Sequence, residues 1–179
     1  MIHRDIKESN ILLHSPAGSN RVILKICDFG LVKTQKNVEQ STLISFSGTI
    51  PYMPPELIMS GSKTKADAKV DLWSTGIMLY RILTHSFPFE SVDTQDVMLF
   101  MFNKTLTRPK SVKDDIVWDL ITKLLTFDRK DRISSSDALK HPFFIGKQAL
   151  KEISPLSIQL AQSAQSAKQK GDKICQQGS

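Results

Sequence analysis

The segment 67–84 constrains the fold more than any other part of the sequence, because its apolar side chains cover nearly every face of a helix. These side chains are Val70, Leu72, Trp73, Ile77, Met78, Leu79, Tyr80, Ile82 and Leu83. A helix that is apolar all round lies inside a hydrophobic core, whereas a surface helix carries a single apolar stripe. We therefore expect this segment to form a helix in the middle of a core.

Shorter helices are predicted on the C-terminal side of this segment, because residues 93–103 and 115–126 each carry an apolar stripe with helical spacing. The apolar side chains are Val97, Phe100 and Met101 in the first helix and Ile116, Leu120, Ile121, Leu124 and Leu125 in the second. Residues 134–137 have the spacing of a capping box, which predicts a short helix that ends before Pro142.

The N-terminal third of the chain predicts a hairpin and a loop. Two short apolar runs, 11–13 and 22–26, flank a cluster of turn-forming residues at 15–20. This pattern is typical of a β-hairpin with a long connection. Residues 31–50 are polar and show no period, so we predict a flexible loop there.

Length and composition predict one globular domain followed by a tail. The chain has 179 residues, of which 40% are hydrophobic, and this fits a single domain. From about Ser154 onward, Gln, Ser, Ala and Lys dominate and large apolar residues are few. We therefore predict a domain over residues 1–147 and a polar Gln/Ser/Lys-rich tail over 148–179 that is disordered on its own.

Charge and cysteine usage restrict the partners and the compartment. The formal net charge is +6, from 24 basic and 18 acidic residues. The basic residues form no stripe and do not alternate with aromatic ones, which argues against a nucleic-acid partner. Two cysteines do not make a disulfide framework in a chain of this size, which indicates a reducing compartment.

No part of the sequence predicts a signal peptide or a membrane-spanning helix. His3, Arg4 and Asp5 interrupt any early apolar run, and the longest apolar stretch ends at Arg81. That stretch is well short of the ~20 residues that span a bilayer. We therefore expect no membrane partner and a cytoplasmic protein, with the nucleus as the alternative.

The first thirty residues contain two polar motifs that carry chemistry. The motif H-R-D-x-x-x-x-N occupies residues 3–10, and D-F-G occupies residues 28–30. Phosphoryl transfer needs groups that position the reactants and cancel negative charge. Asp5 could orient a hydroxyl group and accept its proton, and Lys7 could place a positive charge beside the migrating phosphoryl group.

Asn10 and Asp28 supply an amide oxygen and a carboxylate, which are suitable ligands for Mg²⁺ bridging the phosphates of ATP. The alternative interpretation is structural, because Asp in a loop is usually a turn former and Asn before a strand is usually a cap. Either motif alone occurs by chance in many sequences and would be weak evidence. Their occurrence in this order, separated by a predicted hairpin, favours the catalytic interpretation.

Further matches follow along the chain. Residues 48–56, G-T-I-P-Y-M-P-P-E, resemble the end of a kinase activation segment, and residues 71–77, D-L-W-S-T-G-I, resemble the start of the central helix of a kinase. Residues 138–144, which include H-P-F-F at 141–144, resemble the last helix of the domain. Over residues 1 to about 147 the chain therefore resembles the C-terminal lobe of eukaryotic protein kinases. Lys7 and Thr49 are the choices of the serine/threonine type.

This resemblance implies a mainly α fold, with a helical bundle around a buried central helix and a small β-hairpin at the catalytic loop, as a fragment of an α+β fold. It implies transfer of the γ-phosphoryl group of ATP to Ser or Thr of protein substrates, with Mg²⁺. The implied catalytic residues are Asp5, Lys7 and Asn10. The implied nucleotide-binding residues are Lys7, Asn10, Leu12 and Asp28, of which Asn10 and Asp28 hold the metal.

The resemblance also implies structural contacts around these residues. Asp71 would hold the backbone of the His3–Asp5 turn, and Thr49 would form hydrogen bonds near Asp5 and Lys7. It further implies an ion pair of Arg132 with Glu56, and stacking of His3 on Phe29 in the D-F-G motif that ends at Gly30. Two residues would contact the nucleotide: Leu12 would lie under the adenine, and Cys27 would line the back of the pocket.

Arg4 suggests control by phosphorylation, because a guanidinium group beside the catalytic aspartate is a ready partner for a phosphate dianion. The segment that follows Asp28 contains several hydroxyl groups, among which we favour Thr42 or Ser45 as the acceptor of an upstream activating kinase. The alternative is that these hydroxyl groups are ordinary loop composition.

Two positions depart from the pattern of similar kinases that prefer substrates with an arginine before the acceptor, here called arginine-directed kinases. Those kinases usually carry glutamates where this chain has Ser9 and Arg81. The loss of one carboxylate and the gain of a cation should disfavour a basic residue shortly before the acceptor. We therefore predict a preference that is not arginine-directed, although Glu8 or Glu90 could compensate.

The sequence also lacks a Gly-rich loop and the lysine that protein kinases carry ahead of the catalytic loop. We therefore expect the chain alone to show no phosphotransfer, to be unstable, and to expose the apolar faces of its central helix around Trp73, Met78 and Tyr80. A truncated product is the favoured interpretation. The alternative is a non-catalytic module that binds partners through this lobe and the tail.

Overall fold

A computed structural model of the chain describes residues 1–15, 22–34, 42–45, 47–59 and 63–152, together with 155, 159, 162, 163 and 166. It divides into two compact units, Met1–Ala138 and Leu139–Ser179. Each unit is described by itself.

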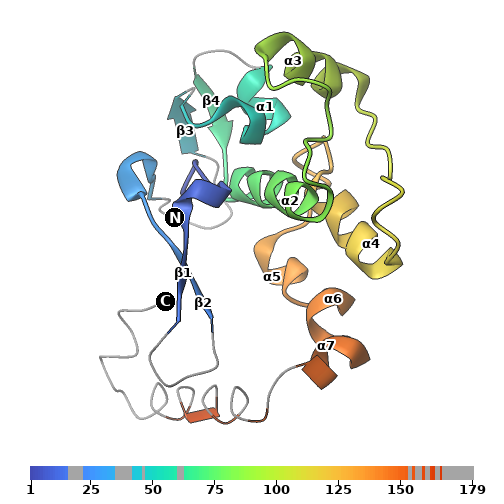
Figure 1. Cartoon of the computed structure of the whole chain (residues 1–179). Coiled ribbons are helices and arrows are strands. Elements are labelled where there is room, and N and C mark those ends of the chain that lie inside the picture. The colour runs from blue at the N-terminus through green and yellow to red at the C-terminus, as the bar shows by residue number, and fades with distance from the viewer. Residues whose placement is uncertain are drawn as a thin grey trace. The chain divides into compact units, whose positions relative to one another are not determined.

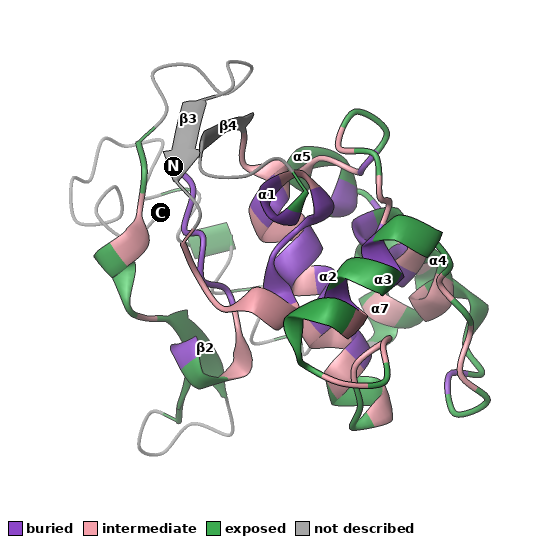
Figure 2. Ribbon diagram, turned by 90° about the horizontal axis from the view of Figure 1, so that it is seen from above, coloured by how far each residue is buried: buried purple, intermediate pink, exposed green. Residues whose placement is uncertain are grey.

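The first unit is built around helix α2 (Lys69–Thr84), as Figure 1 shows. The buried residues of α2 are Val70, Trp73, Ser74, Gly76, Ile77 and Tyr80. Figure 2 shows that burial is concentrated on α2 and on the neighbouring short helix α1 (Pro55–Ile58). The prediction of a mainly helical fold around a buried central helix is therefore confirmed.

Helix α4 (Asp115–Leu124) packs against α2, and a glycine permits the close approach. A Cβ atom at Gly76 would lie 2.8 Å from Cδ2 of Leu125 and 2.9 Å from Cβ of Leu124. Helix α3 (Thr94–Asn103) adds Val97, Phe100 and Met101 to the same core. The two helices predicted at 93–103 and 115–126 are therefore confirmed, with Ile116 as a half-exposed member of the α4 stripe.

Side-chain caps fix where these helices begin. The Asp93 carboxylate accepts a hydrogen bond from Asp96 N in α3, and the Asp114 carboxylate accepts from Ile116 N and Val117 N in α4. In helix α5 (Ser135–Ala138), Ser134 Oγ accepts from Asp137 N at 3.1 Å, as the predicted capping box requires. Each cap satisfies backbone N–H groups that have no partner within the helix.

The residues of α2 that are exposed are not the ones that the sequence predicted. Trp73 and Tyr80 were expected to be exposed, but their exposed fractions are 0% and 7%, and Met78 is only half-buried. The reason is that residues of this chain cover them: the Trp73 ring lies 5.3 Å from the ring of Phe127 and 6.5 Å from that of Phe100. The exposed apolar side chains of α2 are those of Ile82 and Leu83.

The predicted hairpin is confirmed as strands β1 (Ile11–His14) and β2 (Ile23–Ile26). They pair antiparallel, with Ile11 opposite Ile26 and His14 opposite Ile23. Short 3-10 helices flank it at η1 (Glu8–Asn10) and η2 (Phe29–Leu31), and a third, η3 (Ile50–Tyr52), precedes α1.

The prediction of a flexible loop over residues 31–50 is wrong in part. Residues 42–45 form strand β3 (Thr42–Ser45), which pairs antiparallel with β4 (Lys63–Ala66). Sequence patterning missed both strands because neither is an apolar run like β1 or β2 and neither shows a clear alternation of polar and apolar side chains: β3 reads T-L-I-S and β4 reads K-T-K-A. Their pairing depends on backbone groups that are distant in the sequence.

The second unit contains helices α6 (Pro142–Ile145) and α7 (Lys147–Glu152). The His141 ring accepts a hydrogen bond from Phe143 N at 3.2 Å and caps α6. The predicted disordered tail 148–179 begins inside α7, and its last residues, 167–179, lie outside the described residues. Among the residues that the structure describes, none belongs to a helix long and apolar enough to cross a membrane.

Candidate active site

The first turn of α2 stabilises the turn at residues 3–5. The two carboxylate oxygens of Asp71 accept hydrogen bonds from His3 N and Arg4 N, both at 2.8 Å. Arg4 has a left-handed backbone with φ 72°, so these bonds stabilise a conformation that a non-glycine residue rarely adopts. Burial raises the pKa of Asp71, and the two backbone donors oppose that rise. The contact implied for Asp71 is therefore present.

Asp5 is buried, and each of its carboxylate oxygens has two donors. Oδ1 accepts from Thr49 N at 3.1 Å and from Thr49 Oγ1 at 2.8 Å. Oδ2 accepts from Asn10 Nδ2 at 3.1 Å and lies 2.8 Å from Lys7 Nζ. Burial raises the pKa of Asp5, but the hydrogen bonds from Lys7, Thr49 and Asn10 and the charge of Lys7 outweigh it. The net effect lowers the pKa, so the carboxylate is ionised at neutral pH.

Residues distant in the sequence meet at this carboxylate. Lys7 Nζ also donates to Thr49 Oγ1 at 2.7 Å, so Asp5, Lys7 and Thr49 form one hydrogen-bonded cluster. Gly48 allows the segment 48–49 to lie against the catalytic loop. Its φ is 123°, and a Cβ atom there would lie 2.7 Å from the Arg4 carbonyl oxygen. Only glycine fits this position without displacing the loop.

Asn10 and Asp28 lie at the same end of the β1–β2 hairpin. Cys27 N donates to the Asn10 carbonyl oxygen at 2.9 Å, which extends the strand pairing to the residue before Asp28. Asn10 Nδ2 donates to the Asp5 carbonyl oxygen at 2.9 Å as well as to the carboxylate, so the amide is fixed in orientation. Its Oδ1 has no hydrogen-bond partner within the described part of the chain and is available as a ligand.

The Asp28 carboxylate is exposed, and its position is set locally. The residue has a left-handed backbone with φ 62°, and Oδ1 accepts from Gly30 N at 3.3 Å. One exposed carboxylate and one oriented amide oxygen suit Mg²⁺, which keeps several waters and takes further ligands from phosphates. The donor set therefore fits the predicted metal. No cluster of three or more His, Cys, Asp or Glu residues that could hold a metal occurs among the described residues.

Leu12, the residue assigned to adenine, is exposed, and so is Phe29, the predicted stacking partner of His3. The His3 ring contacts the Phe29 ring edge-on, with centroids 5.1 Å apart, and His3 Nε2 lies 3.2 Å from the Cys27 carbonyl oxygen. Phe29 is 53% exposed and Leu12, on β1, is 54% exposed. The contact of His3 with Phe29 is present, whereas the place of Leu12 under adenine stays a prediction.

Arg4 is buried, and its guanidinium group is already engaged. Arg4 Nε donates to the carbonyl oxygen of Leu31 in η2. Burial lowers the pKa of Arg4, and the charge of Asp71 opposes this. The favoured phosphorylation sites, Thr42 and Ser45, lie on β3, and their side chains are outside the part of the chain that the structure describes. Their phosphorylation stays a prediction.

The ion pair implied for Arg132 and Glu56 is present and bidentate. Arg132 Nη1 and Nη2 lie 2.8 and 2.9 Å from the two Glu56 oxygens. Arg132 also donates to the carbonyl oxygens of Lys69 and Thr126 at 2.9 and 3.0 Å. Its guanidinium group lies 5.0 Å from the centroid of the Trp73 ring, and the residue is 1% exposed. This side chain joins α1 to α2.

A second polar cluster beside the catalytic loop was only partly predicted. Tyr52 OH donates to the Glu8 carboxylate, and Arg81 Nη1 donates both to Tyr52 OH and to Glu8 Oε2, the latter at 3.2 Å. The Arg81 guanidinium group also lies 4.4 Å from the centroid of the Phe87 ring. Burial, followed by the hydrogen bond to Glu8, raises the pKa of Tyr52 to about 12.

Sequence reasoning singled out Glu8 and Arg81 but not Tyr52 or Phe87. Tyr52 is the tyrosine of the G-T-x-x-Y motif, so its place in a motif was the only available signal. The cluster neutralises Glu8, because Arg81 supplies a positive charge to it at close range.

Comparison with known proteins shows the family of the chain. The family model described as the protein kinase domain matches residues 1–144. The human serine/threonine-protein kinase ULK1 is 37% identical over 166 residues. An Aurora kinase of Debaryomyces hansenii is 33% identical over 148 residues, and the serine/threonine-protein kinase cds1 of Schizosaccharomyces pombe is 36% identical over 148 residues.

These alignments cover most of the chain but a minor part of each relative. They span 88%, 83% and 79% of the chain and 15%, 34% and 31% of the three relatives, in the same order. The chain therefore spans no more than about a third of the length of these relatives.

Proposed function

This chain belongs to the protein kinase family, serine/threonine type, and on that premise we propose that it forms the catalytic and substrate-binding lobe of an active kinase. The reaction is transfer of the γ-phosphoryl group of ATP to a Ser or Thr hydroxyl of a protein. The observation that carries the proposal is the four-donor environment of Asp5, joined through Asn10 to the end of the hairpin where Asp28 lies.

Asp5 orients the acceptor hydroxyl group and takes its proton late in the transfer. The pKa of Asp5 is lowered, so its carboxylate is a weak base but a strong hydrogen-bond acceptor at neutral pH. Thr49 and Asn10 hold the carboxylate in one orientation, which favours an in-line geometry for the hydroxyl group. Because Lys7 lies beside the carboxylate, its ammonium group can stabilise the negative charge on the migrating phosphoryl group.

Asn10 and Asp28 are proposed to hold Mg²⁺ and, through it, the phosphates of ATP. A bound Mg²⁺ neutralises charge on the phosphate oxygens and aligns them for transfer. The contribution of the chain is to fix the two ligands: Asn10 through its bonds to Asp5, and Asp28 through Gly30 N and its position after the hairpin. The exposed Leu12 side chain is proposed to contact adenine on one side only. We therefore expect phosphotransfer to require a nucleotide-binding lobe.

The Glu8–Tyr52–Arg81 cluster supports a preference that is not arginine-directed. Arg81 neutralises the Glu8 carboxylate, one of the two that could attract a basic residue of the substrate. A carboxylate neutralised in this way no longer attracts a basic side chain shortly before the acceptor. Phosphorylation of a peptide array should show no enrichment of arginine upstream of the acceptor, and a profile dominated by such arginines would contradict this part of the proposal.

The proposed activity is tested with the longest product encoded by the transcript, in comparison with the 179-residue chain. Labelled ATP and a mixture of acceptor proteins serve as substrates. We expect the longer product to transfer phosphate and the chain alone to transfer none. Asp28→Ala in the longer product should lower the rate by at least about 10²-fold, because a metal ligand is lost.

The matched control is Asp131→Ala, which removes an exposed carboxylate outside the site. It should leave the rate unchanged. An active longer product that keeps its full rate after Asp28→Ala would overturn the assigned chemistry. If the longer product itself shows no transfer, the chain is instead a kinase-like binding module.

A further inference from the structure

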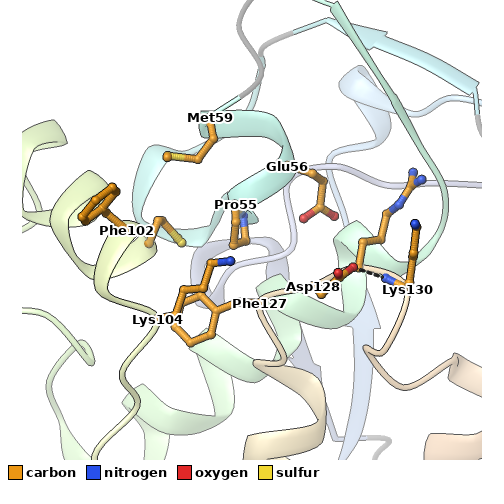
Figure 3. A pocket seen from close by; sticks show the side chains of 10 residues that line it. Pro55, Glu56, Met59, Phe102, Lys104, Phe127, Asp128 and Lys130 are labelled. Atoms are coloured by element: carbon orange, nitrogen blue, oxygen red, sulfur yellow. Dashed lines mark hydrogen bonds between the residues drawn. The ribbon is translucent and has the colours of Figure 1, made fainter.

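A cavity of about 640 Å³ lies on the first unit, formed by residues other than those around Asp5. Pro55 and Met59 of the α1 region, Met101 and Phe102 of α3, and Phe127 give it an apolar lining. Figure 3 shows Phe102 at one end of the cavity and Asp128 and Lys130 at the other. Its volume is in the range of cavities that bind ligands or anchoring side chains.

The apolar lining continues onto the surface of α3. Phe102 is 73% exposed and Met59 is 51% exposed, and the α3 residues Met98 and Leu99, one turn from Phe102, are also exposed. Exposed apolar side chains that gather beside a cavity mark an interaction surface, whereas single ones do not. This surface, defined here by Met59, Met98, Leu99 and Phe102 with the cavity, is called the α3 surface.

The charges around the cavity are unequally compensated. Among the charged residues that line it, Glu56 is paired with Arg132 and Arg129 lies 3.8 Å from Asp67, whereas the Asp128 carboxylate accepts a backbone hydrogen bond from Lys130 N and keeps its negative charge. Lys104 and Lys130 both line the cavity, and neither ammonium group forms an ion pair with any of the residues that the structure describes. An apolar cavity with two such lysines favours a ligand that combines an apolar group with negative charge.

We propose that the α3 surface docks an acidic segment of a partner protein, with a bulky apolar side chain in the cavity and carboxylates against Lys104 and Lys130. Two other occupants fit the charges less well. Residues 153–179 of this chain contain three lysines and one aspartate, and a second copy carries a net charge of +6. This proposal does not depend on phosphotransfer, because none of the residues that form the α3 surface belongs to the site around Asp5.

The test measures binding to the full 179-residue chain by fluorescence anisotropy. The probe is a fluorescein-labelled peptide with one phenylalanine in a run of aspartate and glutamate residues. Two matched probes replace the phenylalanine with alanine, or the acidic residues with glutamine. We expect saturable binding of the first probe only, weakening as salt rises, because screening reduces the charge term.

Two sets of variants locate the binding. Phe102→Ser should weaken binding by about tenfold, since an anchoring aromatic contact is lost. Lys104→Glu combined with Lys130→Glu should weaken it by about tenfold, because two attractive charges become repulsive. Lys110→Glu combined with Lys113→Glu makes the same charge change at exposed lysines outside the cavity and should leave affinity within about twofold.

All of these side chains are exposed, so we expect the unfolding temperature of each variant to match that of the original chain. The proposal is overturned if the first probe shows no saturable binding, or if the alanine probe binds as tightly. It is also overturned if the Lys110 and Lys113 pair weakens binding as much as the Lys104 and Lys130 pair. An oligonucleotide that competes as well as the peptide would show a polyanion site instead.

Discussion

The core around α2 and the β1–β2 hairpin differ in how completely this chain covers them. At the core, Trp73 and Ile121 are 0% exposed and Arg132 is 1% exposed. On the hairpin, Leu13 is 70% exposed and Leu24 is 67% exposed. Stability therefore resides mainly in the first region, whereas Asn10 and Asp28 lie at the end of the second. The difference teaches that residues 3–8 are fixed from the core side, by Asp71 and Arg81 of α2 and by Thr49, whereas the hairpin leaves much of its own surface uncovered.

The largest expected effect of a substitution lies in the core. Arg132→Ala should lower the free energy of unfolding by about 3–5 kcal/mol, because it leaves the Glu56 carboxylate without its partner. It also removes the donor to the Lys69 and Thr126 carbonyl oxygens. Urea unfolding monitored by tryptophan fluorescence measures the change, since Trp73 lies under the guanidinium group.

Lys123→Ala is the matched control for Arg132→Ala. It breaks the Lys123–Asp119 pair, whose side chains are 46% and 49% exposed. An exposed pair one turn apart on a helix contributes only about 0.3–0.5 kcal/mol. If the two substitutions changed stability equally, the contrast between the buried pair and the surface would fail.

A smaller loss is expected where α2 meets α4. Gly76→Ala adds a methyl group that would lie within 2.8–2.9 Å of Leu124 and Leu125. Alanine favours a helix by about 1 kcal/mol over glycine, but overpacking a core costs about 1–3 kcal/mol. The two effects oppose each other, and we expect a net loss of about 1–2 kcal/mol in thermal or urea unfolding. An unchanged or higher stability would show that α4 shifts freely away from α2.

The pH dependence of stability separates the two aspartates that shape the catalytic loop. The pKa of Asp5 is lowered from its usual 3.8, so its contribution is fully present above that value and is lost as the pH falls through the lowered pKa. Asp5→Asn should therefore cost about 1 kcal/mol at neutral pH, and less below about pH 4. Urea unfolding of both forms over a range of pH measures this difference.

Asp71 should behave in the opposite sense. Burial raises its pKa, so the folded chain takes up a proton before the unfolded chain does. The penalty of its buried charge then disappears as the pH falls through the raised pKa. The difference between the original chain and Asp71→Asn should change at a higher pH than the difference for Asp5→Asn. Identical profiles for the two variants would contradict the assigned environments.

The sequence was sufficient for elements with strong local signals. The α2 helix followed from its apolar faces, α3 and α4 followed from apolar spacing, and α5 followed from the capping-box spacing at 134–137. Strands β3 and β4 lacked such a signal, because their mixed and polar sequences show no apolar run and the two strands pair across a distance in the sequence. The burial of Trp73 was mispredicted because its cover, Phe100 and Phe127, comes from packing far along the chain.

In the candidate site, too, residues within short motifs were predicted, whereas contacts between distant segments were not. Asp5, Lys7, Asn10, Asp28 and Thr49 were predicted from motifs that resemble those of protein kinases, since each occupies a fixed place in a short pattern. The Tyr52 contacts were not found, because Glu8 and Arg81 lie 44 and 29 residues away from it in the sequence. Only the fold brings these groups together, around the segment that Gly48 allows to approach the catalytic loop.

The smallest expected effect on stability lies on the hairpin and tests the other side of the comparison. Leu13 and Leu24 are cross-strand neighbours, and both are exposed. Replacing both with threonine keeps strand propensity and removes exposed apolar surface, so the free energy of unfolding should change by no more than about 0.5 kcal/mol per site. Self-association, measured by light scattering, should decrease. A loss of several kcal/mol would mean that the hairpin belongs to the cooperative core, and the contrast between the two regions would then be wrong.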